Sequence, residues 1–193
     1  MPPECDVPIR RHWFWQPDDL VTLKSLEHLL GIYYRSVGFG ANLLLNVLPN
    51  REGLIDENDR ERLLATAAEL RRRFAAPIAG SPRQEGDTAI VDFGRPVHFD
   101  HLVLAEDLSR GQRVDGYTVA REGDGAPVSA GHTIGHKKID AFPAVTADRL
   151  RIVLGGPKPR LSSVTAHFTG IEKRPRLGTD HEECDWSEKV DKP

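Results

Sequence analysis

The first residues whose types and spacing could do chemistry are two carboxylates, Glu4 and Asp6. In an extended strand, side chains two positions apart point to the same face and lie about 6–7 Å apart. Retaining cleavage of a glycosidic bond uses two carboxyl groups about 5–5.5 Å apart, one as nucleophile and one as acid/base. Glu4 and Asp6 are therefore candidates for contact with a sugar. The alternative is that they cap backbone groups or pair with Arg10.

Three consecutive aromatic residues, Trp13, Phe14 and Trp15, are the main candidates for ligand binding. An exposed aromatic ring can stack on the apolar C–H face of a sugar. The alternative for these residues is core packing between a strand and its helix. Arg10 is a candidate to bind a hydroxyl or carboxylate of the ligand, but a structural ion pair is the favoured role for it. For Asn46, a role in fixing the following turn is favoured over contact with a ligand.

These residues belong to the first half of the chain, whose sequence pattern predicts strands and helices. Pro17-Asp18-Asp19 signals a helix start, and apolar residues from Leu20 to Tyr34 recur at helical spacing. Residues 41–47 form a short apolar run typical of a fully buried strand. Asp56 is placed to cap a second helix that continues to about Phe74. A strand between two helices indicates a βα unit of a parallel sheet.

The second half has a period of two, which indicates strands. Residues 76–86 are rich in Pro, Gly and polar residues and are expected to be a linker. Residues 87–172 are expected to form an antiparallel β-sandwich. Its predicted strands are Thr88–Phe93, His98–Leu104, Arg113–Arg121, Leu150–Leu154 and Val164–Phe168. Residues 173–193 are charged and poor in aliphatic residues, so we expect a disordered tail there.

Composition excludes several classes of function. The 193 residues carry 26 Lys and Arg against 29 Asp and Glu, a net charge of −3, which disfavours a nucleic-acid partner. No apolar run approaches the ~20 residues that span a bilayer, and the N-terminus has no leader-like pattern, so no membrane partner is expected. The eight histidines lack metal-ligand spacing, and neither a metal nor a cofactor is expected.

A series of motifs resembles the α-L-fucosidases of glycoside hydrolase family 29. In the first half these are ECDVPIR (4–10), WFW (13–15), LKSL (23–26), IYYRSVG (32–38), NLLLNV (42–47) and PNREGLI (49–55). In the second half they are LAED (104–107), GQRV (111–114) and GHTIGHKK (131–138). The chain departs from the family pattern at Pro8, at Arg11-His12 and at Leu48, which affects local loop geometry.

The resemblance implies an α+β chain in which residues 1–75 form the end of a (β/α)8 barrel, one or two βα units, ahead of a galactose-binding-like sandwich. A whole barrel takes about 250 residues. The family's nucleophile and acid/base are expected upstream of the matched region, so no catalytic residue is assigned and the chain alone is expected to be inactive. The resemblance also implies fucosylated glycans as partners. The alternative is a carbohydrate-binding or structural sandwich without hydrolytic role. An unpaired barrel edge further predicts self-association. The compartment is left open.

Overall fold

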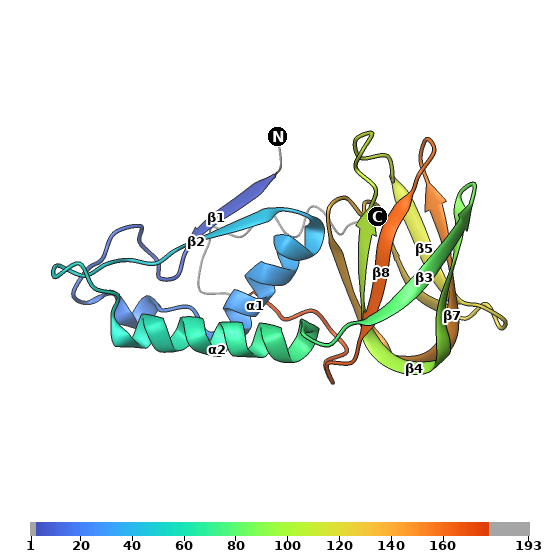
Figure 1. Cartoon of the computed structure of the whole chain (residues 1–193). Coiled ribbons are helices and arrows are strands. Elements are labelled where there is room, and N and C mark those ends of the chain that lie inside the picture. The colour runs from blue at the N-terminus through green and yellow to red at the C-terminus, as the bar shows by residue number, and fades with distance from the viewer. Residues whose placement is uncertain (1–2, 178–193) are drawn as a thin grey trace.

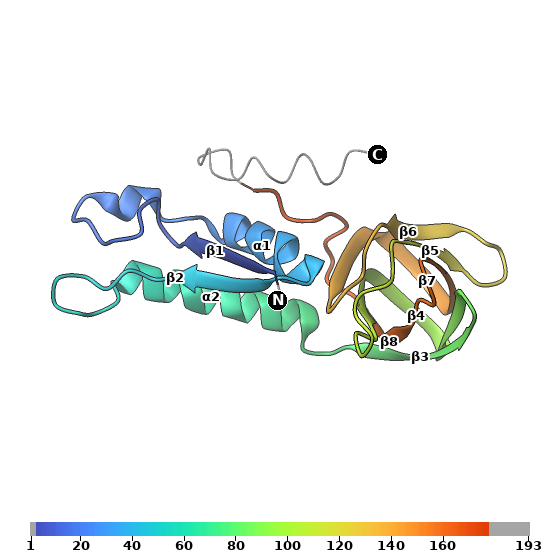
Figure 2. The same ribbon diagram turned by 90° about the horizontal axis from the view of Figure 1, so that it is seen from above.

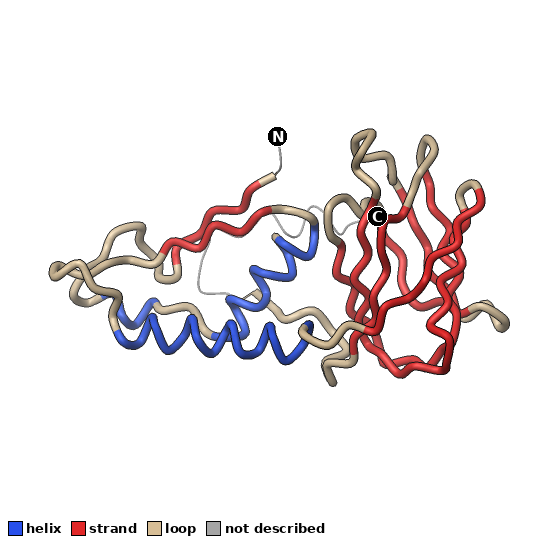
Figure 3. The backbone as a smooth tube through the Cα atoms, viewed as in Figure 1, coloured by secondary structure: helices blue, strands red, loops and turns tan. Residues whose placement is uncertain are grey.

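A computed structural model describes residues 3–177 in two parts, a pair of strand–helix repeats and a β-sandwich (Figure 1, Figure 3). The first part contains β1 (Glu4–Pro8), the 3-10 turn η1 (Asp19–Thr22), α1 (Leu26–Arg35), η2 (Val37–Phe39), β2 (Asn42–Asn46) and α2 (Glu57–Phe74). The sandwich contains β3 (Ile78–Glu85), β4 (Thr88–Glu106), β5 (Gly116–Arg121), β6 (Pro127–Gly131), β7 (Lys138–Gly155) and β8 (Leu161–His167). Within the described residues, no helix is both long and apolar enough for a membrane span.

The first part consists of two βα units. β1 and β2 pair in parallel, with Cys5 opposite Leu43 and Val7 opposite Leu45. One face of this two-stranded sheet packs on the helices, where Val7, Leu43 and Leu45 contact the buried Leu29 and Ile32. The predicted barrel remnant is confirmed in this arrangement of parallel strands and covering helices.

Two local expectations in this part were wrong. The first long helix begins at Leu26 rather than Leu20, because the Ser25 side chain caps it by accepting a hydrogen bond from the His28 amide. The residues after Pro17 form only the short turn η1. The strand β2 is covered on one face only, since Leu44 remains 49% exposed. The expectation of a helix ending at Phe74 is confirmed by α2.

The second part is an antiparallel sandwich, as expected. The strand order is β3-β8-β4-β7-β5-β6, and β3 also pairs with β4. β4 and β7 are long and bend, so their pairing has two stretches, Thr88–Asp92 with Arg149–Val153 and Val97–Leu104 with Lys138–Ala147. Each bent strand therefore serves both layers, and the apolar core between the layers includes Phe99 and Ile152.

The predicted boundaries of the sandwich need two corrections. Most of the expected linker 76–86 is strand β3, because Ile78–Gly80 pair with β8 and Ser81–Glu85 pair with β4. Part of the expected tail is packed: Arg35 donates to the carbonyl of Pro175 at 3.1 Å, and a Cβ on Gly31 would lie 2.8 Å from the carbonyl oxygen of Arg176. The rest of that tail, 178–193, lies outside the described residues.

A buried polar network joins the two parts. His101 of β4 bonds Asp100 through Nδ1 at 2.8 Å and Tyr34 of α1 through Nε2 at 2.8 Å. Because an ionised carboxylate only accepts, the His101 Nδ1 carries the hydrogen and Nε2 accepts from the Tyr34 hydroxyl. Arg73 of α2 donates to the same hydroxyl at 3.2 Å and also pairs with Glu69. The helices and the sandwich are therefore held in one orientation by directional bonds.

Two histidines at this seam are buried, and burial favours the neutral form of each. Burial lowers the pKa of His101 below its ordinary value, against the opposing effect of Asp100. Burial, with the charges of His101 and Lys137, lowers the pKa of His167 to about 4. His167 packs against the Phe74 ring at 5.3 Å. Protonation of either histidine therefore disfavours the docked arrangement.

We predict a loss of stability on acidification between pH 6.5 and 5. In that range the unfolded histidines bind protons that the folded ones do not, so the contribution present above pH 6.5 is lost as pH falls toward 4. For His167 the full loss is on the order of 2–3 kcal/mol. Unfolding in urea at each pH measures it. His167→Gln should flatten the profile, whereas changing the exposed His98 to Gln should not; parallel profiles for all three proteins would contradict the prediction.

Candidate functional site

The predicted carboxylates lie on the open face of the β1–β2 sheet. Glu4 and Asp6 alternate with Cys5 and Val7, so they point away from the face that packs on the helices. Figure 2 looks onto this open face, with the helices behind it. Glu4 accepts a weak 3.3 Å hydrogen bond from Asn42, its neighbour in the pairing register. Both carboxylates are exposed and are available to a partner or ligand on that face.

The aromatic segment lies at the carboxyl ends of the same strands. Phe14 is 84% exposed and Trp13 is 44% exposed, so their rings do not serve the core of the described fold. The Asn46 side chain at the end of β2 donates to the carbonyl of Trp13 at 3.0 Å, so it holds the aromatic loop rather than the turn that follows it, which was the role expected. Trp15 is half-buried and its indole donates to Asp56 at 2.7 Å.

Arg10 forms a buried charge cluster beneath this loop. Its guanidinium is 1% exposed and donates to Asp59 at 3.0 Å and to Asp56 at 2.8 Å. Burial raises the pKa of Asp59, although Arg10 opposes the shift. The hydrogen bond from Trp15, with those from Arg10 and Asn50, lowers the pKa of Asp56. The structure thus places Arg10 in an internal ion pair, the role favoured for it from the sequence.

The geometry assigns Asp56 a role that its sequence position did not suggest. It stands at the start of α2, but its side chain makes no capping hydrogen bond. Its carboxylate instead receives Arg10, Trp15 and Asn50, which come from two loops. Lys24 contributes a second fixation point, donating to the carbonyls of Pro8 and Arg10 at 2.7 and 2.9 Å. Together these bonds set the path of the chain from β1 into the aromatic loop.

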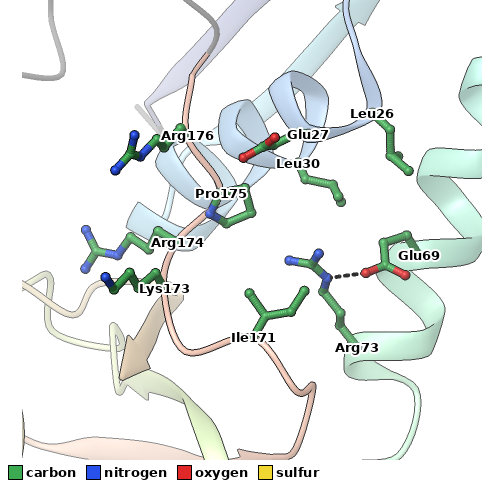
Figure 4. A pocket seen from close by; sticks show the side chains of 10 residues that line it. All are labelled: Leu26, Glu27, Leu30, Glu69, Arg73, Ile171, Lys173, Arg174, Pro175 and Arg176. Carbon is green, nitrogen blue, oxygen red and sulfur yellow. Dashed lines mark hydrogen bonds and ion pairs between the residues drawn. The ribbon is translucent and has the colours of Figure 1, made fainter. Parts of the chain in front are cut away.

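A pocket of about 530 Å³ lies at the junction of α1, α2 and the segment 171–176, away from these residues (Figure 4). Arg73 points toward Glu69 within it. Hydrogen bonds from Arg72 and Arg73 lower the pKa of Glu69 to about 2. Because these charges are paired with one another, we interpret the pocket as a boundary between packed elements rather than a reaction site.

The open face and its loop present polar and aromatic side chains but hold few groups for catalysis. Two carboxylates on one strand face, with aromatic rings at the strand end, suit hydroxyl contacts and stacking. Glu4 is four residues from the end of β1, so about 13 Å of strand separates it from the aromatic loop. Among residues 3–177, no three His, Cys, Asp or Glu side chains converge as metal ligands.

Comparison with known proteins finds relatives that match the N-terminal region and the sandwich together. Residues 3–73 match the family model described as "Alpha-L-fucosidase". A rice protein (Oryza sativa subsp. japonica), "Putative alpha-L-fucosidase 1", is 31% identical over 195 residues, covering 82% of this chain and 37% of that protein. A glycoside hydrolase 29 family member from an unknown rumen bacterium superposes with a TM-score of 0.76 at 29% identity, over 94% of this chain and 34% of that one.

A third match is the Ruminococcus gnavus family 29 fucosidase in complex with fucose, at 25% identity and a TM-score of 0.74, covering 86% of this chain and 41% of that one. The order of parallel βα units followed by an antiparallel sandwich is thus shared with glycoside hydrolases of family 29. The chain belongs to the α-L-fucosidases of glycoside hydrolase family 29 and corresponds to their C-terminal portion. It spans 37% of the length of the rice relative.

We predict that the Arg10 cluster is required for folding of the first part. Asp59→Ala leaves a buried guanidinium with one partner fewer, which should cost about 3 kcal/mol or more. Unfolding followed by tryptophan fluorescence measures this, because the Trp15 indole donates to Asp56 of the cluster. Glu57→Ala removes a neighbouring carboxylate that is exposed and should leave the midpoint nearly unchanged. Equal midpoints for the two variants would show that the pair is not stabilising.

Proposed function

We propose that this chain contributes the C-terminal portion of an enzyme that removes terminal α-L-fucose from glycans by a retaining, two-carboxylate mechanism. The supporting observation is that both parts of the chain, in order, match family 29 fucosidases, one of them in complex with fucose. In this proposal the first part supplies the last βα units of the catalytic barrel. The sandwich supports them through the buried network around Tyr34 and His101.

The residues proposed to meet the sugar are those on the open face and its loop. The face that carries Glu4 and Asp6 is opposite the helices, and in a (β/α)8 barrel that face points inward. Trp13 and Phe14 offer exposed rings at the carboxyl ends of the strands, where barrel enzymes place their sites. The Asp56 hub would hold this loop in place, with Trp15 and Arg10 as positioning residues.

The 193 residues by themselves are proposed to lack hydrolytic activity. Glu4 and Asp6 share one exposed strand face, and neither lines the pocket between the helices. A retaining mechanism needs two carboxyl groups about 5–5.5 Å apart that flank the scissile bond, one as nucleophile and one as acid/base. The described residues do not provide such an arrangement.

A chimera tests the proposed activity. We replace the equivalent C-terminal portion of the rice relative by this chain and assay 4-nitrophenyl α-L-fucoside. The chimera should hydrolyse it, and Trp13→Ala should raise KM about three- to tenfold, equivalent to about 0.7–1.4 kcal/mol of lost stacking. The 193-residue chain alone should show no turnover.

Two results would contradict this proposal. A chimera that folds, judged by circular dichroism, but has no activity would refute the contribution to a fucosidase site. Turnover by the isolated chain that Glu4→Ala or Asp6→Ala abolishes would refute its inactivity. Val21→Ala is the matched control for Trp13→Ala, because Val21 is a 91% exposed apolar residue of η1.

Self-association is proposed for the same face of the isolated chain. Among the described residues the β1–β2 sheet has two strands, so its outer edges offer backbone groups that no described strand pairs with. Leu44 adds apolar surface on the open face. A second copy would cover both.

Light scattering at tens of micromolar should therefore report a species larger than a monomer. Leu44→Lys should shift the distribution toward monomer, because a charge disfavours burial of that face. Leu64→Lys serves as the control, since Leu64 is an exposed leucine of helix α2. A monomeric parent chain, or equal effects of the two substitutions, would contradict the proposal.

A further inference from the structure

A second concave site lies at one end of the sandwich, where three loops meet. The β3–β4 hairpin and the loops that follow β4 and β7 rise from the same end (Figure 1). They enclose a pocket of about 840 Å³, within the size range of small-molecule sites. Its lining includes four basic residues, Arg110, Arg113, Lys158 and Arg160. It also includes two acidic residues, Asp87 and Asp107, so the pocket has a formal excess of positive charge in a chain of net charge −3.

The four cations of this pocket have no carboxylate partner within ion-pair distance among the described residues. Elsewhere on the sandwich, exposed arginines are paired: Arg121 with Asp124, Arg149 with Asp92 and Arg151 with Glu122. Asp107 lines the same pocket but its carboxylate accepts from the Ser109 amide. The basic side chains here are therefore left with unused donors.

Arg113 gives an independent indication of a missing partner. Its only side-chain hydrogen bond runs from Nη2 to the carbonyl of Asp107 at 3.3 Å. Its Nε is buried and has no hydrogen-bond partner among the described residues. Buried donors without partners are rare in native structures and call for an explanation. The same guanidinium lines the pocket, where an anion bound by its terminal nitrogens would offset the cost of the unpaired Nε.

The pocket is pre-formed rather than a gap between mobile loops. Gln84 donates to the carbonyl of Pro159 and accepts from the Leu161 amide, which fixes the loop after β7. The Asp107 amide donates to the carbonyl of Arg160 at 2.8 Å and ties that loop to the one after β4. Lys158 is held at φ 53°, and it is the only non-glycine residue with positive φ in the described part of the chain. Such strain persists only where the surroundings enforce it.

The lining also indicates the chemistry of the ligand. None of its described residues is aromatic, so it lacks the stacking platform that suits a neutral sugar ring. Guanidinium groups bind carboxylate or sulfate with charge-assisted hydrogen bonds. The carboxylates of Asp87 and Asp107 and the Ser109 hydroxyl can accept from ligand hydroxyls. The same two carboxylates disfavour a polyphosphate.

We propose that this loop-end pocket binds an acidic saccharide, with Arg110, Arg113 and Lys158 on its anionic group and Asp87 and Asp107 on its hydroxyls. The site adds a ligand class beyond the proposed fucosidase function. Its existence does not depend on whether the chain contributes to fucoside hydrolysis, and its test contains no activity assay.

Calorimetric titration of the full 193-residue chain at low ionic strength provides the test. Trigalacturonic acid and galactose 6-sulfate represent the carboxylate and sulfate forms of the ligand, galactotriose is the neutral control, and sodium sulfate is the bare anion. At least one acidic saccharide should bind, galactotriose should not, and affinity should fall as salt is raised. The form that binds more tightly identifies the anionic group.

Matched arginine variants locate the site. Arg110→Ser should weaken binding about three- to tenfold. Arg95→Ser should leave the affinity unchanged. Arg95 is also exposed, but it lies in the bend in the middle of β4, whereas the pocket lies at the two ends of that strand, next to Asp87 and Asp107. Arg113→Gln should abolish binding, with thermal unfolding as the check that the variant folds.

Several outcomes would overturn the proposal. They are no binding of either acidic saccharide, equal binding of galactotriose, equal affinity for sodium sulfate alone, or equal losses for Arg110→Ser and Arg95→Ser.

Discussion

The buried Arg10 guanidinium is the constraint on which the first part of this structure depends. An arginine keeps its charge in proteins, so its burial requires carboxylates at fixed positions. Asp59 and Asp56, 49 and 46 residues further along the chain, meet that requirement. This brings the start of α2 to the end of β1. The aromatic loop is then positioned as a consequence, because Asp56 also receives the Trp15 indole. One charge pairing therefore fixes a strand, a helix and the loop that carries the proposed sugar contacts.

The contact between the two parts also depends on buried polar groups at fixed positions. Tyr34, His101 and Asp100 form a chain of hydrogen bonds across the seam. Asp100 also accepts the amides of Thr169, Gly170 and Ile171, which holds the exit of β8 against β4. Burial opposes ionisation of Asp100, but the bonds from His101 and these amides lower its pKa below the ordinary value. Directional bonds of this kind specify one orientation, whereas an apolar seam would tolerate sliding. That suits a sandwich that supports the βα units in a fixed position.

Much of this architecture could be predicted from sequence because its signals are local. The apolar spacing of α2 and the period-two pattern after residue 87 each depend on neighbours in the chain, and both predictions are confirmed. The fate of Arg10 was not local: two roles fitted its sequence, and the choice depended on carboxylates from another element. Asp56 was misassigned as a helix cap for the same reason. The linker interpretation of 76–86 failed because pairing with β4 and β8 overrode a turn-rich composition.

The loop-end pocket could not be predicted from the sequence, because it depends on which charged side chains lie near one another in three dimensions. Its basic residues come from two loops more than 40 residues apart, and none belongs to a basic run in the sequence. A chain with more acidic than basic residues has enough carboxylates to neutralise every cation, as it does for Arg121, Arg149 and Arg151 on the same sandwich. Within residues 3–177, four cations around one concavity have no carboxylate within ion-pair distance, and the buried Arg113 Nε has no partner, which reflects placement rather than a shortage of acidic residues. In a protein interior or cleft, such donors are stabilised by an acceptor that arrives from outside the chain.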